Sequence, residues 1–167
     1  YDVLEALSEE RNLAFLAIGR PETEGCYCQV NDLLKEIIGG LSQNFDVVII
    51  DGEAGIEQVN RRVMEAVSHL ILVSDASQKG IHVCRTIQRV AAAVVSYQQA
   101  GLIVNRVHEE DAALLTGLSP LIPIGTIPES EQVRRFDIEG RSLLSLPNCG
   151  ALQAVRRCLI HIGLLAS

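Results

Sequence analysis

The chain has 167 residues, with 14 basic and 21 acidic side chains and a net charge of −7. This length supports one sizeable core, which buries roughly 70% of the surface that the unfolded chain exposes. The acidic balance argues against nucleic acid as a partner, because binding phosphates needs a basic surface. No apolar run approaches the ~20 residues that span a bilayer, and no charged and apolar leader opens the chain, so we expect a cytoplasmic protein without a transmembrane segment.

Short apolar runs are the first elements that the sequence predicts. In chain order they are LAFLAI (13–18), DVVIID (46–51), LILVSD (70–75), GLIVNRV (101–107) and IPIGTIP (122–128). Their continuous apolar character is typical of strands buried on both faces of a parallel sheet. Helical spacing of apolar residues falls over 30–41, 56–67, 81–94, 109–118, 130–139 and 149–166. This alternation predicts an α/β fold, with three layers around a mostly parallel, doubly wound sheet, in a single domain over 1–167.

An acidic residue follows the second predicted strand. Ligands of doubly wound sheets gather at the carboxyl ends of the strands, and the run VVIIDGEAG places Asp51 at such an end, with Gly55 shortly after it. This is the pattern of a carboxylate that holds Mg²⁺ or its bound water beside a phosphate. The alternative is an aspartate that caps a helix beginning near Ile56.

Two later strand ends carry residues suited to a nucleotide base. LIVNRV ends in Asn105 and Arg106, and IPIGTIPE ends in Pro128 and Glu129. An asparagine side chain can both donate to and accept from a purine edge, and a proline loop gives the base a rigid wall. The alternatives are an asparagine that tolerates a turn and a proline that ends a strand.

These segments together resemble the deviant-Walker ATPases, the class of MinD, ParA-type partition ATPases and the nitrogenase iron protein. DGEAG is close to the D-x-x-A-G strand end of that class, and LIVNRV and GTIPESEQVRRFDIEGRSLL follow in the same order. The resemblance implies a P-loop NTPase-like fold that binds ATP or ADP with Mg²⁺. The implied site residues are Asp51 beside the metal, Gly55 in a switch loop, and Asn105, Arg106, Pro128 and Glu129 around adenine.

The phosphate-cradling loop G-x-x-x-x-G-K-[ST] is missing from this sequence. Its two lysines, Lys35 in LLKEI and Lys79 in SQKGI, lie outside any glycine-rich loop. In the deviant-Walker class this loop follows the first strand, so we expect an N-terminally truncated fragment that begins after it. The intact protein is then expected to be an ATPase, whereas this chain alone is predicted to be inactive.

Cys26 and Cys28 stand in GCYCQVN, just before a helix expected to begin near Asn31. A helix N-terminus lowers the pKa of a thiol, and thiolates bind Zn²⁺ or Ni²⁺ better than hard cations. A tetrahedral site needs four ligands, and a twofold dimer would supply two such pairs. Burial as small apolar side chains and a reversible redox pair are the alternatives.

The cysteine segment narrows the resemblance to the carbon monoxide dehydrogenase maturation factors. GRPETEGCYCQVNDLL, DGEAGIEQVNRR, LVSDASQKG, LIVNRV and IPESEQV with DIEGRSLL carry it over nearly the whole chain. It implies an ATP-dependent metallochaperone that inserts nickel into carbon monoxide dehydrogenase, with metal at a homodimer interface and nucleotide controlling dimer closure. The rival interpretations are a MinD- or ParA-like regulatory or partition ATPase without metal cargo, and a non-catalytic binding module.

The remaining cysteines are interpreted as structural. Cys84 falls on an apolar helical stripe and is predicted to lie in the core, while Cys149 and Cys158 lie around the last helix without partners. Ser77 is predicted to cap the helix that follows LILVSD. Arg134 and Arg135 are predicted to face solvent or to form surface ion pairs.

Overall fold

The computed structural model describes residues 7–10, 12–17, 36–52, 66–108 and 117–166. The chain divides into two compact units, Tyr1–Gly52 and Glu53–Ser167. The single domain expected over 1–167 stays a prediction. Among the residues that the structure describes, no helix has the length and apolar character needed to cross a membrane.

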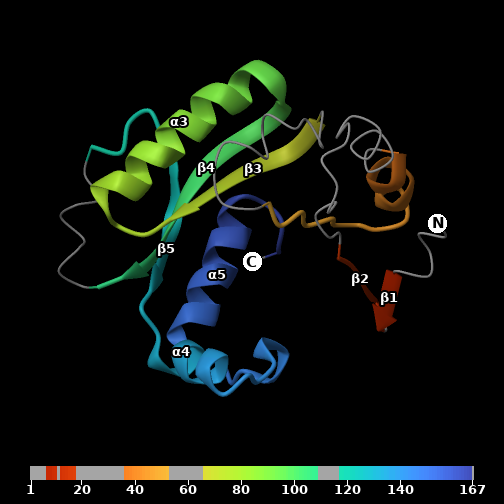
Figure 1. Ribbon diagram of the computed structural model, residues 1–167, viewed down its shortest axis with the longest axis vertical. Coiled ribbons are helices and arrows are strands. Elements are labelled where there is room, and N and C mark those ends of the chain that lie inside the picture. The colour runs from red at the N-terminus through yellow and green to blue at the C-terminus, as the bar shows by residue number, and fades with distance from the viewer. Residues whose placement is uncertain (1–6, 11, 18–35, 53–65, 109–116, 167) are drawn as a thin grey trace, which may run out of the picture. The chain divides into compact units, whose positions relative to one another are not determined.

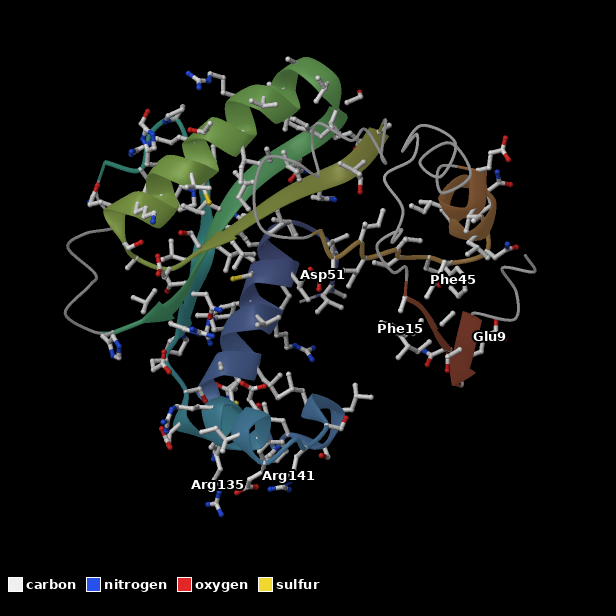
Figure 2. All side chains as sticks on the ribbon, viewed as in Figure 1. Glu9, Phe15, Phe45, Asp51, Arg135 and Arg141 are labelled. Carbon is white, nitrogen blue, oxygen red and sulfur yellow. The ribbon has the colours of Figure 1, made fainter. Side chains whose placement is uncertain are left out.

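The first unit contains a short antiparallel hairpin, in which β1 (Leu7–Glu10) pairs with β2 (Leu13–Leu16) (Figure 1). The prediction that LAFLAI forms a buried parallel strand is wrong for the described part of the run. Its strand pairs antiparallel, and Phe15, labelled in Figure 2, is 64% exposed. Alternate β2 side chains are exposed, as expected for a strand that is covered on one face only.

The run DVVIID in the same unit is not a strand, so this prediction is also wrong. Residues 36–42 form the described part of the helix predicted over 30–41, and residues 47–50 after it are irregular and exposed. Asp51 is exposed as well (Figure 2). No strand of the described residues pairs with 46–51, and an extended backbone without a neighbour leaves its N–H and C=O groups to water.

The second unit is built on a parallel sheet of β3 (Ala66–Ser74), β4 (Ser96–Val107) and β5 (Pro123–Pro128), in the order β3-β4-β5 (Figure 1). The sheet confirms the strands predicted from LILVSD, GLIVNRV and IPIGTIP. Ile71 lies opposite Gly101 in the β3–β4 ladder. All three strands therefore end at one edge, where the predicted adenine residues fall.

Three helices of this unit agree with the sequence pattern. They are α3 (Gln78–Val94), α4 (Glu131–Ile138) and α5 (Gly150–His161), and a short helical turn, η3 (Leu143–Ser145), lies between the last two. Ser77 caps α3 as predicted, because its hydroxyl accepts a hydrogen bond from the backbone N–H of Gly80 at 3.0 Å. Ser130 caps α4 in the same way, at 3.4 Å from Val133 N.

Three predicted helices differ from the structure in their described parts. In the segment predicted as a helix over 56–67, residues 66 and 67 belong to β3, and 56–65 lie outside the described residues. The last helix ends at His161, not at residue 166, because Gly163 has a φ of 77°. The N–H groups of Gly163 and Leu164 bond to Ile160 O and Leu159 O at 3.0 and 2.9 Å, a Schellman termination that favours glycine. Of the helix predicted over 109–118, only 117 and 118 are described, and they are not helical.

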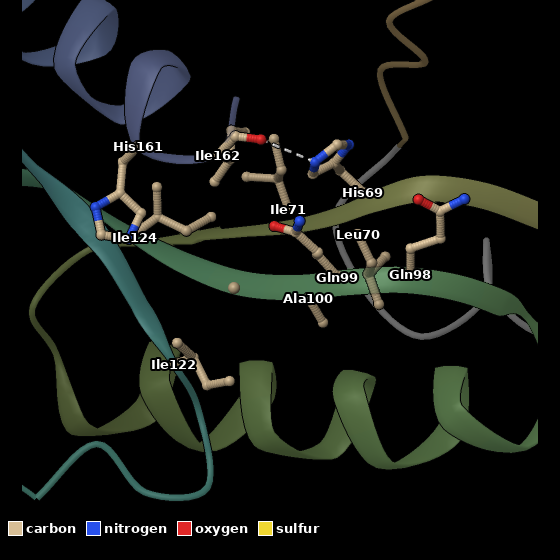
Figure 3. Close-up of a pocket in the computed structure, with 11 residues that line it drawn as sticks. His69, Leu70, Ile71, Gln98, Gln99, Ala100, Ile122, Ile124, His161 and Ile162 are labelled. Atoms are coloured by element: carbon tan, nitrogen blue, oxygen red, sulfur yellow. Dashed lines mark hydrogen bonds between the residues drawn. The ribbon is translucent and has the colours of Figure 1, made fainter. Parts of the chain in front are cut away.

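Helices cover both faces of the sheet, as the predicted three-layer fold requires. On one face, Leu72, Leu102 and Val104 form a buried cluster with Ile81 and Cys84 of α3. α5 packs against β5 on the opposite face (Figure 3). Gly125 permits this contact, since a Cβ there would lie 2.7 Å from Cys158 Sγ.

The exposed arginines of α4 form surface ion pairs, as predicted. Arg134 lies 3.2 Å from Glu131, and Arg135 lies 2.7 Å from Glu139. Arg141 bonds to the second oxygen of Glu139, and its guanidinium stacks 3.9 Å from the centre of the Phe136 ring. Arg135 and Arg141, both labelled in Figure 2, lower the pKa of Glu139 through their hydrogen bonds to its carboxylate.

Candidate functional site

The ends of β4 and β5 bring together all four residues that the sequence predicts around adenine. Asn105 and Arg106 lie near the end of β4, Pro128 ends β5, and Glu129 follows it. The backbone N–H of Glu129 donates to Val107 O at 3.2 Å, which ties the two strand ends together. The roles of these residues remain predictions, but they are neighbours in space.

Asn105 and Arg106 form a bulge in the β4–β5 ladder. Val104 pairs with Thr126 and Val107 with Pro128, so β4 takes one more residue than β5 over this step. Arg106 has a φ of 56°, a left-handed conformation that costs a residue other than glycine about 1–2 kcal/mol. Such strain is maintained where the surrounding structure enforces it, and it clusters at functional sites. Sequence reasoning found these residues but not the bulge, because register depends on the partner strand.

At the bulge, the side-chain amide of Asn105 keeps a hydrogen-bond acceptor and a hydrogen-bond donor for a purine edge. Its Oδ1 accepts a hydrogen bond from Arg106 N at 2.9 Å and keeps a second lone pair. Within the described residues, its Nδ2 has no partner, so it can donate to a base. Asn105 is half-buried, and Pro128 beside it is exposed. The residues present therefore fit an adenine base.

Asp75, just after β3, adds a charged group to the same edge, and sequence reasoning assigned it no role. Its Oδ1 accepts hydrogen bonds from the hydroxyl and the backbone N–H of Ser77, at 2.6 and 3.1 Å. These bonds lower the pKa of Asp75, and the positive charge of Arg106 lowers it further. The sequence signal that could have identified Asp75 is its position as an acidic residue directly after the strand LILVS.

None of the remaining predicted site residues lies in the described part of the second unit. Asp51 belongs to the first unit, and the expectation that it ends a buried strand is wrong because the run before it is exposed and irregular. Gly55, Cys26 and Cys28 lie outside the described residues. Within the described ranges, no group of three or more His, Cys, Asp or Glu side chains is placed to hold a metal.

The three described cysteines are buried free thiols. Cys84 and Cys158 are each 3% exposed, and Cys149 is 9% exposed. The core location predicted for Cys84 is confirmed. Burial raises the pKa values of the Cys84 and Cys158 thiols, which keeps them protonated and poorly reactive.

A cavity of about 260 Å³ lies on the α5 face, away from the strand ends just described (Figure 3). It is bounded by the first halves of the strands and by the end of α5. His69 there bonds to Ile162 O at 3.1 Å and so connects β3 to the C-terminus of α5. None of the predicted site residues lines this cavity.

The parallel sheet and its helices form an α/β fold that resembles the P-loop NTPase-like fold of MinD. MinD of Pyrococcus horikoshii, solved with Mg-ADP, superposes with a TM-score of 0.69 over 98% of this chain and 69% of the MinD chain. The sequence identity is 19%, so this likeness concerns the fold. The predicted fold class is confirmed.

Sequence comparisons point to ATP-binding proteins. No protein-family model matches the chain. An uncharacterized ATP-binding protein of Methanocaldococcus jannaschii is 33% identical over 149 residues, which are 87% of this chain and 59% of the relative. The carbon monoxide dehydrogenase accessory protein of Rhodospirillum rubrum is 26% identical over 139 residues, 75% of this chain and 49% of the relative. The chain thus spans about half the length of the curated relatives that it matches.

Proposed function

We propose that the intact protein is an ATPase of the MinD-like type that acts as a metallochaperone, inserting nickel into carbon monoxide dehydrogenase. The observation that carries the nucleotide part is the strained bulge that places Asn105 and Arg106 beside Pro128 and Glu129. The similarity to an ATP-binding protein of Methanocaldococcus jannaschii also supports nucleotide binding. The accessory protein of Rhodospirillum rubrum supports the finer assignment to carbon monoxide dehydrogenase.

The residues of the strand ends would bind the nucleotide base. Asn105 would donate through Nδ2 and accept through the remaining lone pair of Oδ1, and Pro128 would form a rigid wall. Asp51 would hold Mg²⁺ or its water, and Gly55 would let a switch loop move. The bound Mg²⁺ would neutralise phosphate charge during hydrolysis.

The nickel ion is the cargo in this proposal, and Cys26 and Cys28 would bind it as thiolates. Two thiolates fill half of a tetrahedral site, so a second subunit would supply the other two. ATP binding would close the homodimer around the metal. The same four sulfurs would accept Zn²⁺ readily.

A second candidate is a regulatory or partition-type ATPase without metal cargo, with structural or redox-active cysteines. MinD of Pyrococcus horikoshii, which shares the fold, is a septum site-determining protein, so the fold is compatible with this role. Both candidates use the same nucleotide residues. They differ in what Cys26 and Cys28 do.

Metal content and oligomer size of the intact protein distinguish the candidates. We expect purified protein loaded with Ni²⁺ or Zn²⁺ to hold about one ion per two subunits, and a chelator to dissociate the dimer. Changing Cys26 and Cys28 to Ser should abolish both metal binding and metal-dependent dimerisation. Cys149→Ser is the matched control, because Cys149 occupies an N-cap position at which serine is favourable. Unchanged metal binding in the double variant would refute the metallochaperone role and leave the regulatory ATPase.

A further inference from the structure

One stretch of the second unit carries basic side chains and no acidic ones. The chain has 21 acidic side chains, and none of them falls within residues 76–107. The same stretch holds Lys79, Arg85, Arg89 and Arg106. The first three belong to α3, so a positively charged helix is built into a protein whose net charge is −7.

The outer side of α3 gathers two of these charges. Lys79, His82 and Arg89 are exposed, and their separations of three and seven residues place them on one side of the helix. Ile81 and Cys84, on the other side, are buried against the sheet. α3 forms the outer layer on its side of the sheet (Figure 1). Lys79 and Arg89 are ten residues apart, which spans about 15 Å of helix.

The basic side chains of α3 and α4 differ in their partners. Arg134 and Arg135 of α4 lie 3.2 and 2.7 Å from glutamate oxygens. Within the described part of the chain, Lys79 and Arg89 form no ion pair. The charges of α4 are thus matched inside the protein, whereas those on the outer side of α3 can pair with carboxylates of another molecule.

Val83 adds an apolar group to the same side of α3. It is 41% exposed and lies one helical turn after Lys79. Protein–protein interfaces combine apolar contacts with a polar rim, whereas a site for a simple anion has no need of an exposed valine. We call Lys79, His82, Val83 and Arg89 together the α3 face.

We propose that the α3 face is a docking surface for an acidic protein partner, whose aspartate or glutamate side chains pair with Lys79 and Arg89 around Val83. The net charge of −7 repels nucleic acid and anionic membranes as a whole. A protein partner can instead match the local positive charge without bringing a uniformly negative surface. An acidic helix fits well, because its carboxylates repeat at the same spacing. This inference is independent of the proposed nucleotide site.

The test measures the affinity of the intact protein for a labelled helical peptide with glutamates on one side around a leucine, by fluorescence anisotropy. A peptide with glutamines in their place is the control, and we expect only the glutamate peptide to bind. Lys79→Glu combined with Arg89→Glu should weaken its binding about tenfold or more, because two attractive pairs become repulsive. Glutamate favours helices, and position 79 lies near the helix N-terminus, where a negative charge is favourable.

Arg134→Glu combined with Arg135→Glu is the matched control, since it changes the net charge equally. α4 lies well apart from α3 (Figure 1). At about 0.1 M salt, where the Debye length is about 10 Å, this control should change the dissociation constant by about twofold or less. Lys79→Gln combined with Arg89→Gln is a milder second variant, whose loss should lie between those of the two reversals.

Three results would overturn the inference. Equal losses for the α3 and α4 reversals would show that the peptide senses only net charge. A wild type that does not bind the glutamate peptide would leave the α3 face without its expected ligand. Tighter binding of phosphatidylserine vesicles or duplex DNA through Lys79 and Arg89 would assign the face to another class of partner. ADP binding, measured on the same samples, tests the proposed function separately.

Discussion

Two short apolar runs, each followed by a polar residue, behave differently in this protein. Residues 102–104 of β4, in the run LIVN, are at most 7% exposed, whereas Val47 to Ile50, in the run VVIID, are 38–83% exposed. β4 has a strand on each side, and within the described ranges the run 46–51 has none. Apolar character alone therefore does not make a strand, because the backbone groups also need partners.

The largest expected effect compares one side chain from each run. Leu102 is fully buried, so Leu102→Ala should lower the free energy of unfolding by about 2–5 kcal/mol. Val48 is 44% exposed, and Val48→Ala should change it by about 0.5 kcal/mol or less. Denaturant unfolding of the 167-residue chain measures both.

Equal losses of unfolding free energy for Leu102→Ala and Val48→Ala would contradict this contrast, since they would show that Val48 is buried in a core. The same two variants can also be compared in the intact protein. There we expect Val48→Ala to become costly if Val48 gains a partner strand. Amide exchange at residues 47–50 should slow accordingly.

Glycines in the two regions give the next contrast. A Cβ at Gly101 would meet Ile124, with its Cδ1 2.6 Å away, whereas a Cβ at Gly39 would meet nothing within 4 Å. Gly101→Ala should destabilise the chain by about 1–3 kcal/mol through overpacking. Gly39→Ala lies in a helical stretch and should stabilise it by about 0.5–1 kcal/mol. Thermal melts of the two variants would contradict the account if they shifted in the same direction.

The smallest effect concerns the thiols. Because burial raises the pKa values of Cys84 and Cys158, their thiolates form only above the ordinary thiol pKa of 9.0 in the folded chain. Each unit of raised pKa lowers the thiolate fraction about tenfold at a given lower pH. Iodoacetamide labelling at pH 8, followed by mass spectrometry, should therefore modify Cys26 and Cys28 first. Labelling of Cys84 in the folded chain at the rate of an unfolded control would show that it is accessible.

The raised thiol pKa values also set a direction for stability. The two protonated thiols contribute fully to the stability of the folded chain below the pKa that they have in the unfolded chain. This contribution is lost as the pH rises through their pKa values in the folded chain. The free energy of unfolding should thus fall at alkaline pH, and less so in a Cys84→Ala variant. A variant and wild type with identical alkaline profiles would exclude Cys84 as a source of the effect.

The sequence predicts an element correctly where its local apolar pattern is matched by packing partners in the structure. β3, α3, β4, β5, α4 and the start of α5 were predicted because each apolar run or stripe has neighbours within the same unit. LAFLAI and DVVIID were misassigned because pairing is a long-range property that no single run contains. The end of α5 was missed because Gly163 acts through its backbone conformation.

The candidate site was predictable in its residue types and not in its geometry. Asn105, Arg106, Pro128 and Glu129 could be named because strand ends of a parallel sheet meet at one edge. The bulge at Arg106 could not be foreseen, since it depends on how β4 and β5 are aligned. Asp75 was placed at the end of the run LILVSD without a role, because its hydrogen bonds with Ser77 depend on the turn that follows β3.

The most direct measurement compares two carboxamides on the same strand for their effect on ADP binding. Asn105 lies at the carboxyl end of β4, and Gln98 lies near its beginning. In the intact protein, calorimetry should show that Asn105→Ala weakens ADP binding about tenfold or more, because hydrogen bonds to the base are lost. Gln98→Ala should leave the dissociation constant unchanged. Equal affinities for Asn105→Ala and wild type would contradict a nucleotide site at this edge.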